Sequence, residues 1–119
     1  QFGTAFLDTD EAGTQEPYRA ALRSAGELPR LTRVFSGRPA RALPNRFTNE
    51  AETQAWPVAD FPIQNALTQP IRRAGAERGD AGVMALWSGV GVDRLRRMPA
   101  AEMVATLAGE AWPTSPAYG

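Results

Sequence analysis

The first candidate for chemistry is the segment Gln1-Phe2-Gly3-Thr4. Gly3 would let a phosphate group approach the backbone closely, and Thr4 adds a hydroxyl donor beside exposed backbone N–H groups. Apolar residues follow as far as Leu7, so we expect residues 1–7 to form the end of a β-strand. In α/β folds, ligands bind outside the carboxyl ends of parallel strands. Taken alone, a Gly-Thr pair is more often a simple turn, and that alternative stays open.

A second candidate is the glycine-containing segment 36–41, which carries two arginines, Arg38 and Arg41. Two guanidinium groups beside such a turn could clamp an anion. The alternative, which the pattern favours, is a helix N-terminus that Ser36 caps, with both arginines in solvent.

Two polar residues of a predicted helix, Gln64 and Thr68, form the third candidate. Their spacing of four residues places them on one helix face, where they could line a polar pocket. The pattern alone favours a different interpretation, in which this polar face meets water.

The fourth candidate is the segment Leu86–Gly91, in which Trp87 precedes two glycines. The glycines would allow a planar ligand to approach the backbone, and the indole would form a wall of its site. The alternative is a tryptophan packed in the core beside a glycine-rich turn.

The composition excludes several other kinds of chemistry. The 119 residues include no His, Cys or Lys, so thiolate nucleophiles, disulfides, imidazole bases and Schiff-base lysines are absent. No carboxylate pair is spaced for acid–base catalysis, and we expect Asp8, Asp10 and Glu11 to lie in a solvated loop. Thirteen arginines balance 13 acidic residues, which argues against nucleic-acid binding. No apolar run approaches the ~20 residues of a membrane span, and we expect neither a metal site nor a signal peptide.

The elements that must position these candidates are mostly helical. We predict strands over residues 1–7 and 31–35. We predict helices over 14–25, 40–52, 62–79, 92–98 and 99–112. Pro70 should divide the helix of 62–79 into two segments joined at 68–70. A strand at the terminus needs partners, so the chain makes sense as part of a larger α/β protein. The chain also begins with Gln1 instead of Met, and we expect the natural start to lie upstream.

These segments, taken in order, resemble the C-terminal third of the nitronate monooxygenase family, formerly called 2-nitropropane dioxygenases. The resemblance rests on segments that cover nearly the whole chain: 1–7 (QFGTAFL), 17–22 (PYRAAL), 32–41 (TRVFSGRPAR), 45–47 (NRF), 61–72 (FPIQNALTQPIR), 86–91 and 99–102. It implies a (β/α)8 barrel that binds FMN and oxidises alkyl nitronates with O2, releasing nitrite and a carbonyl compound. It also implies that Gln1, Phe2, Gly3 and Thr4 end the eighth strand and hold the FMN phosphate, and that the helix carrying Gln64 and Thr68 forms part of the substrate-side wall.

The chain departs from the family pattern at two places. Family members read Trp-Ala-Gly-Gln-Gly where this chain has Trp87 to Gly91, so Val90 lacks an amide that a family member could use. The catalytic His of the family lies upstream, and we therefore expect no catalytic residue in this chain. A barrel needs roughly 250 residues. The prediction is therefore a single partial domain over 1–119, mostly helical, with the last barrel strand at 1–7, helices within 14–112 and a flexible tail at 113–119.

We expect the intact protein to be cytoplasmic, and the isolated chain to be inactive and to bind FMN weakly or not at all. Two alternatives remain open from the sequence. One is a sister flavin barrel, an NAD(P)H-dependent quinone or enoyl reductase, which would use the same phosphate segment. The other is a helical module without catalysis that associates through its apolar helix faces.

Overall fold

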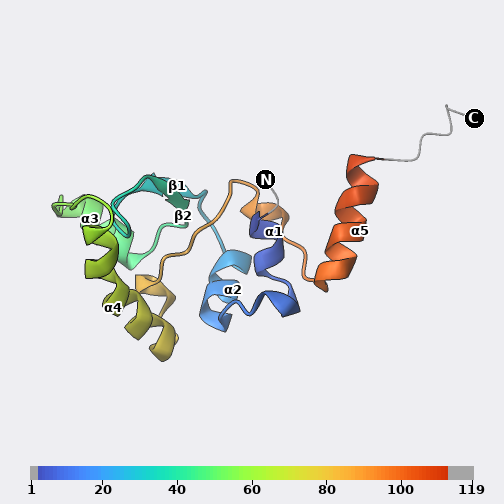
Figure 1. Cartoon of the computed structure of the whole chain (residues 1–119), viewed down its shortest axis with the longest axis horizontal. Coiled ribbons are helices and arrows are strands. Elements are labelled where there is room, and N and C mark those ends of the chain that lie inside the picture. Colours follow the sequence, from blue (N-terminus) through green and yellow to red (C-terminus); the bar gives the residue numbers. More distant parts are fainter. Residues whose placement is uncertain (1–2, 113–119) are drawn as a thin grey trace, which may run out of the picture.

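The computed structural model describes residues 3–112, apart from the side chain of Asp93, and these residues form an extended body (Figure 1). In chain order they are α1 (Gly3–Leu7), the 3-10 turn η1 (Asp10–Ala12), α2 (Glu16–Arg23), β1 (Arg30–Thr32), β2 (Ala40–Ala42), α3 (Arg46–Thr53), α4 (Ile63–Arg78), the 3-10 turns η2 (Ala81–Val83) and η3 (Val92–Arg94), and α5 (Ala100–Ala111). The β-hairpin, α3 and α4 occupy one end, α1 and α2 the middle, and α5 the other end. No helix in this part of the chain is both long and apolar enough to cross a membrane.

A small sheet ties the middle of the chain together. Strands β1 and β2 pair antiparallel, with Leu31 opposite Arg41. The segment after η2 then lies along the other edge of β2, where Leu43 N donates to Leu86 O and Ser88 N donates to Arg41 O. After this pairing, the glycine-rich segment 88–91 runs from the hairpin toward α1 (Figure 1).

Two apolar clusters form the core. The first joins α2 to the later loops and contains Leu22, Leu43, Met84, Leu86 and Val92. The second lies under the hairpin and α3 and is rich in aromatic rings: Phe35 stacks on Phe47 with centroids 5.1 Å apart, and Trp87 meets Phe35 edge-on at 5.5 Å. Trp87 therefore packs against the aromatic core, as the second interpretation predicts, and its side chain is partly buried.

The expected strand at residues 1–7 is wrong over the part that the structure describes. Residues 3–7 form the short helix α1, whose last turn is closed because the Thr9 amide and hydroxyl both donate to Phe6 O. A short apolar run does not distinguish a strand from a buried helix by periodicity, and among the residues that the structure describes no strand lies beside it to supply a ladder. Gln1 and Phe2 lie outside the described residues.

The expected break at Pro70 is also wrong, because α4 runs unbroken through it. A proline within a helix removes one backbone bond, at a cost of about 3 kcal/mol. Here other bonds hold the surrounding turns: Gln64 and Thr68 are anchored to a neighbouring turn, and the Arg72 guanidinium donates to Asn65 O at 3.1 Å.

The remaining predicted elements differ from the structure mainly in their bounds. Helix α5 and most of α2 lie where the sequence predicts helices, whereas the strand of 31–35 is confined to β1. The helix expected over 40–52 divides into β2 and α3, since Asn45 caps α3 through a reciprocal pair of bonds with Thr48. Only a 3-10 turn forms within 92–98, and the predicted tail 113–119 lies outside the described residues.

Candidate functional site

The first turn of α1 meets the glycine-rich segment 88–91. The Gly89 N–H donates to Thr4 Oγ1 over 2.7 Å, although the two residues lie 85 positions apart. A Cβ at Gly89 would lie 3.3 Å from this oxygen, so a larger residue here would require the Thr4 side chain to shift by a few tenths of an ångström. The Thr4 hydroxyl accepts this bond and keeps its own proton to donate. The first and fourth candidate segments are therefore one site, which the sequence alone did not join.

Two cavities open on either side of Thr4. One, of about 510 Å³, lies toward α5 and is lined by Thr4, Ala5, Gly89, Val90, Gly91, Arg94, Leu95, Arg96, Met103, Leu107 and Glu110. The other, of about 420 Å³, lies toward the hairpin and is lined by Gly3, Thr4, Leu31, Pro39, Ala40, Arg41, Trp87, Ser88, Gly89 and Val90. Both cavities share Thr4, Gly89 and Val90 in their linings.

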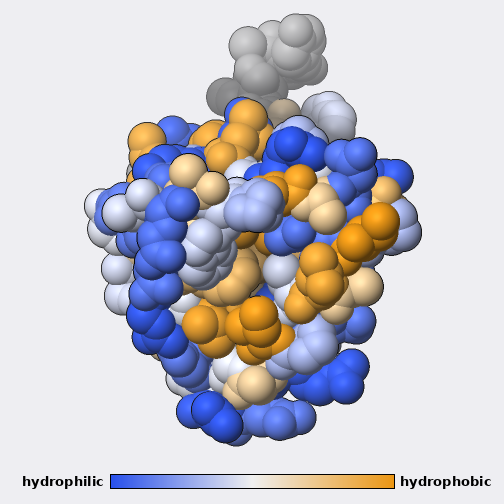
Figure 2. All heavy atoms as spheres, turned by 90° about the vertical axis from the view of Figure 1, so that its left-hand side faces the viewer, coloured by the Kyte–Doolittle hydropathy of each residue, from blue (hydrophilic) through white to orange (hydrophobic). Residues whose placement is uncertain are grey.

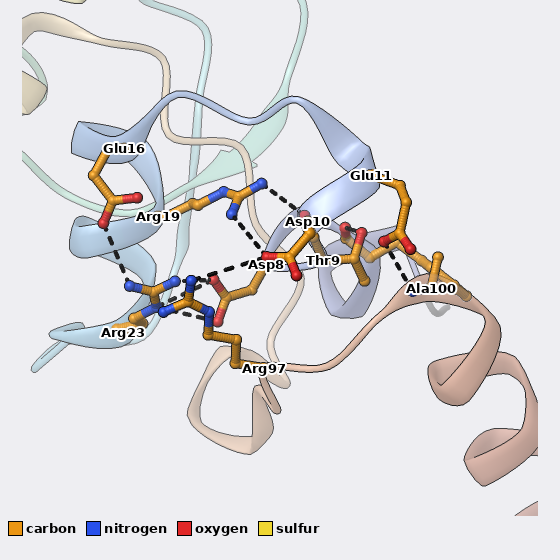
Figure 3. A network of polar contacts seen from close by, with 10 residues as sticks. Asp8, Thr9, Asp10, Glu11, Glu16, Arg19, Arg23, Arg97 and Ala100 are labelled. Atoms are coloured by element: carbon orange, nitrogen blue, oxygen red, sulfur yellow. Dashed lines mark hydrogen bonds and ion pairs between the residues drawn. The ribbon is translucent and has the colours of Figure 1, made fainter.

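The turn that follows α1 is built on a buried carboxylate. Asp8 is only 2% exposed, and its two oxygens accept three bonds from Arg23 of α2, the shortest of them 2.6 Å (Figure 3). The expectation of a solvated acidic loop is therefore wrong for Asp8. The guanidinium fork supplies the charge that makes burial of the carboxylate possible.

Arg19, one helical turn before Arg23, holds the backbone of the same turn. Its Nη2 donates to Thr9 O over 2.6 Å, and Thr9 is itself 1% exposed. The second Nη of Arg19 lies 3.8 Å from Asp10, whose carboxylate also lies 3.9 Å from Arg97. Arg19 Nε is buried and has no hydrogen-bond partner among the residues that the structure describes.

The turn also reaches the last helix. Glu11 accepts a hydrogen bond of 2.9 Å from the backbone N–H of Ala100, the first residue of α5 (Figure 3). This backbone bond lowers the pKa of the Glu11 carboxyl below its usual value. A carboxylate at a helix N-terminus satisfies an amide that has no partner within the helix.

Gln64 and Thr68 share a face of α4, as their spacing predicts, but this face is buried. Gln64 Nε2 donates to Val34 O over 2.7 Å, and Thr68 Oγ1 donates to Phe35 O over 2.5 Å. Gln64 is 8% and Thr68 3% exposed, so the alternative in which this face meets water is wrong. In this chain the two side chains fasten α4 to the 34–35 turn.

The arginine candidate also takes a different form from either prediction. Arg38 lies over the ring of Phe61, with its guanidinium carbon 4.0 Å from the ring centroid, while Arg41 belongs to β2 and lines the 420 Å³ cavity. The helix that Ser36 was expected to cap is absent at this position, because residues 34–36 form a turn instead.

The carbonyl of Trp87 receives a hydrogen bond from the hydroxyl of Tyr18 in α2. Burial raises the pKa of Tyr18 to about 12. This bond fastens the segment 86–88 to α2, just before the chain reaches Gly89.

Sequence reasoning missed the turn around Asp8 as a structural centre. One signal was present: Arg19 and Arg23 are four residues apart, so they share a face of α2 that follows the acidic cluster closely. The pattern could not tell which carboxylate this face would meet.

Comparisons with known proteins agree with one another. A family model described as "Nitronate monooxygenase" matches residues 1–110. A probable nitronate monooxygenase of Staphylococcus saprophyticus is 34% identical over 112 residues, which are 93% of this chain and 32% of that protein. One from Staphylococcus aureus (strain Newman) is 40% identical over 90 residues, 75% of this chain and 25% of that protein.

A solved structure of a related enzyme has a similar fold over the matched region. The nitroalkane oxidase from Streptomyces ansochromogenes superposes with a TM-score of 0.83 at 47% sequence identity, over 91% of this chain and 31% of that chain. The present chain thus spans about a third of the length of the relatives that it matches.

Proposed function

Because the chain belongs to the nitronate monooxygenase family, we propose that it forms the C-terminal part of an FMN-dependent enzyme. The intact enzyme oxidises alkyl nitronates with O2 to a carbonyl compound and nitrite. Family membership supports the proposal that the intact protein is an oxidoreductase. The flavin, the products and the inactivity of the isolated chain are parts of the proposal.

The contact between Thr4 and Gly89 is the main structural support for the proposed cofactor site. The Thr4 hydroxyl has a proton to donate, and the first amides of α1 have no partner within the helix. A Cβ on Gly3 would meet nothing within 4 Å, so its backbone has room for a ligand. In (β/α)8 barrels, phosphate sites often combine the loops after the last strands with the start of a short extra helix. The short helix α1 is an element of this kind.

In this proposal Gly3 and Thr4, together with Gln1 and Phe2, hold the phosphate of FMN. The flavin supplies the redox chemistry, and the chain supplies position and hydrogen bonds. Helix α4 stands on the substrate side of the site, where Gln64 and Thr68 contribute by fixing the helix through their bonds to Val34 and Phe35.

The test uses the full-length gene product that contains this chain. We expect it to purify with flavin in a one-to-one ratio and, with an alkyl nitronate, to consume O2 and release nitrite. Turnover of NADH with a quinone, without nitrite release, would point instead to the sister flavin reductases. The isolated 119-residue chain should show little flavin absorbance, and a stoichiometric flavin spectrum would contradict the proposal that the site needs the rest of the barrel.

A substitution tests the part assigned to Thr4. Thr4→Val keeps the shape of the side chain and removes the hydroxyl, so FMN affinity should fall by about tenfold, the value of one lost hydrogen bond to a charged group. Thr53→Val, at an exposed position in α3, is the matched control and should leave the affinity unchanged.

A further inference from the structure

We propose that Asp8, Arg19 and Arg23 are positioning residues for the phosphate monoester of the cofactor, which they orient through α1 without touching it. The inference rests on the proposed function, because it takes Thr4 as the residue that meets the phosphate. It assigns a role to a cluster of charged residues in which Asp8 and Arg19 are buried and Arg23 is partly exposed (Figure 3).

Helix α1 is too short to hold itself in place. It has five residues and none of them is fully buried. Isolated helices of this length are unstable in water, because the first turn costs several dihedral angles for one hydrogen bond. The position of Thr4 must therefore come from contacts with the rest of the chain, which are the packing of Leu7 against the first apolar cluster and the hydrogen bonds at the two ends of α1.

At its N-terminal end, α1 is held by the bond between Gly89 and Thr4 Oγ1. At its C-terminal end, Thr9 Oγ1 donates to Phe6 O over 2.7 Å, and Thr9 O in turn accepts from Arg19 over 2.6 Å. This second path is a continuous chain of hydrogen bonds from the last turn of α1 to α2.

The pair of Asp8 and Arg23 fixes the direction in which the chain leaves α1. The fork of Arg23 contacts both carboxylate oxygens of Asp8, which restricts the relative orientation of α1 and α2. Because Asp8 is almost fully buried, loss of its partner would leave an uncompensated charge and drive the turn to rearrange.

Hydrogen bonds to a phosphate need their donors placed within about 0.5 Å. Movement of the turn at residues 8–9 would therefore displace the Thr4 hydroxyl, which lies one helical turn away. We infer that the cluster sets the affinity for the phosphate end of the ligand, and leaves contacts to the flavin ring unaffected.

The first experiment needs no added cofactor and uses the full-length gene product that contains this chain. Asp8→Asn should speed amide hydrogen exchange at residues 6–9 and at Gly89, because both ends of α1 lose their fixed geometry. Glu52→Gln, which breaks the exposed pair of Glu52 with Arg30, is the matched control and should leave exchange there unchanged. Equal exchange at these amides in wild type and Asp8→Asn would overturn the inference regardless of any flavin.

The second experiment compares FMN with riboflavin, which lacks the phosphate, in the full-length gene product. Asp8→Asn should lower the preference for FMN over riboflavin by about tenfold, with the affinity for riboflavin nearly unchanged. A general loss of fold would instead weaken both ligands equally and would overturn the inference.

Two further outcomes are distinguishable. If Asp8→Asn does not fold, Arg23→Lys keeps the charge but removes the fork, and the same loss of FMN preference is expected from it. If the wild-type protein itself binds FMN and riboflavin equally well, the proposed phosphate site fails and the inference fails with it. A wild type that prefers FMN, with variants that keep the full preference, would overturn the positioning role alone.

Discussion

Tyr18 illustrates how one buried group couples the stability of this chain to pH. Burial raises its pKa to about 12, above the usual value of 10, so the folded state binds its proton more tightly than the unfolded state does. The stabilisation is complete below pH 10 and is lost as the pH rises toward 12. We expect the free energy of unfolding to fall across this window, as measured by urea titration at several pH values.

Tyr18→Phe provides the control for this effect. It removes the ionisable group together with the hydrogen bond to Trp87 O, so the variant should be less stable at pH 8 but should lose less stability between pH 10 and 12. An identical decline in both proteins would show that other groups cause the alkaline unfolding.

Individual residues show clearly where sequence reasoning stops. The spacing of Gln64 and Thr68 correctly placed both on one face, but their partners are backbone carbonyls of a turn about 30 residues earlier. Asp8 was expected in solvent for the same reason: a local pattern carries no information on a distant guanidinium. Trp87 was easier, because a large aromatic side chain is usually part of a core.

At the scale of elements, Gly37 marks a contact that depends on the backbone alone. It has a φ of 89°, and a Cβ there would lie 2.6 Å from Phe61 N and 2.7 Å from Ala59 O. Gly37→Ala should therefore separate the 34–38 turn from the start of α4. We expect a loss of about 2–4 kcal/mol in the free energy of unfolding, from the left-handed backbone and the clash together.

Gly109 is the matched control for that substitution. It lies within α5, and a Cβ there would meet nothing within 4 Å. Gly109→Ala should stabilise the helix by about 0.5–1 kcal/mol, because alanine loses less backbone entropy. A similar loss of stability from both substitutions would contradict the steric explanation for Gly37.

The longer elements could be predicted, and the shorter ones could not. Helix α5 follows a proline and carries an apolar spacing of three and four residues, so its local pattern is sufficient. Strand β2 and helix α1 have three and five residues, and their conformations depend on partners: the 86–88 segment for β2 and the turn after Leu7 for α1. Both were assigned incorrectly for that reason.

As a whole, the described chain is extended and leaves many apolar side chains uncovered. Its radius of gyration is 17.0 Å, against about 13.5 Å for a compact domain of this length. Seen from the end that carries α3 and α4, the surface has hydrophobic patches between charged groups (Figure 2). The sequence predicted this incompleteness through the family resemblance, and the relatives are about three times as long.

The apolar stripe on α4, formed by Ile63, Leu67 and Ile71, gives a prediction at this scale. These side chains are 61%, 63% and 43% exposed, while the polar residues Gln64 and Thr68 of the same helix are buried. Replacing all three with Gln should reduce binding of a hydrophobic dye and self-association of the isolated chain. The free energy of unfolding should change by no more than about 0.5 kcal/mol per site.

Leu22→Ala is the contrasting variant. Leu22 is 1% exposed within the first apolar cluster, so its truncation should cost about 2–5 kcal/mol and increase dye binding. If the triple Gln variant loses as much stability as Leu22→Ala, the stripe is already packed in the isolated chain.

The contacts of α1 and its turn also determine when during biosynthesis the site can exist. The hydrogen bond of Thr4 needs Gly89, and that of Glu11 needs Ala100. The paired residues are 85 and 89 positions apart in the sequence. A ribosome would have to deliver nearly this entire chain before either bond could form. The contact of Thr4 could therefore form only after residue 89 has been synthesised, and a product that stops before α5 would lack the Ala100 amide that completes the turn.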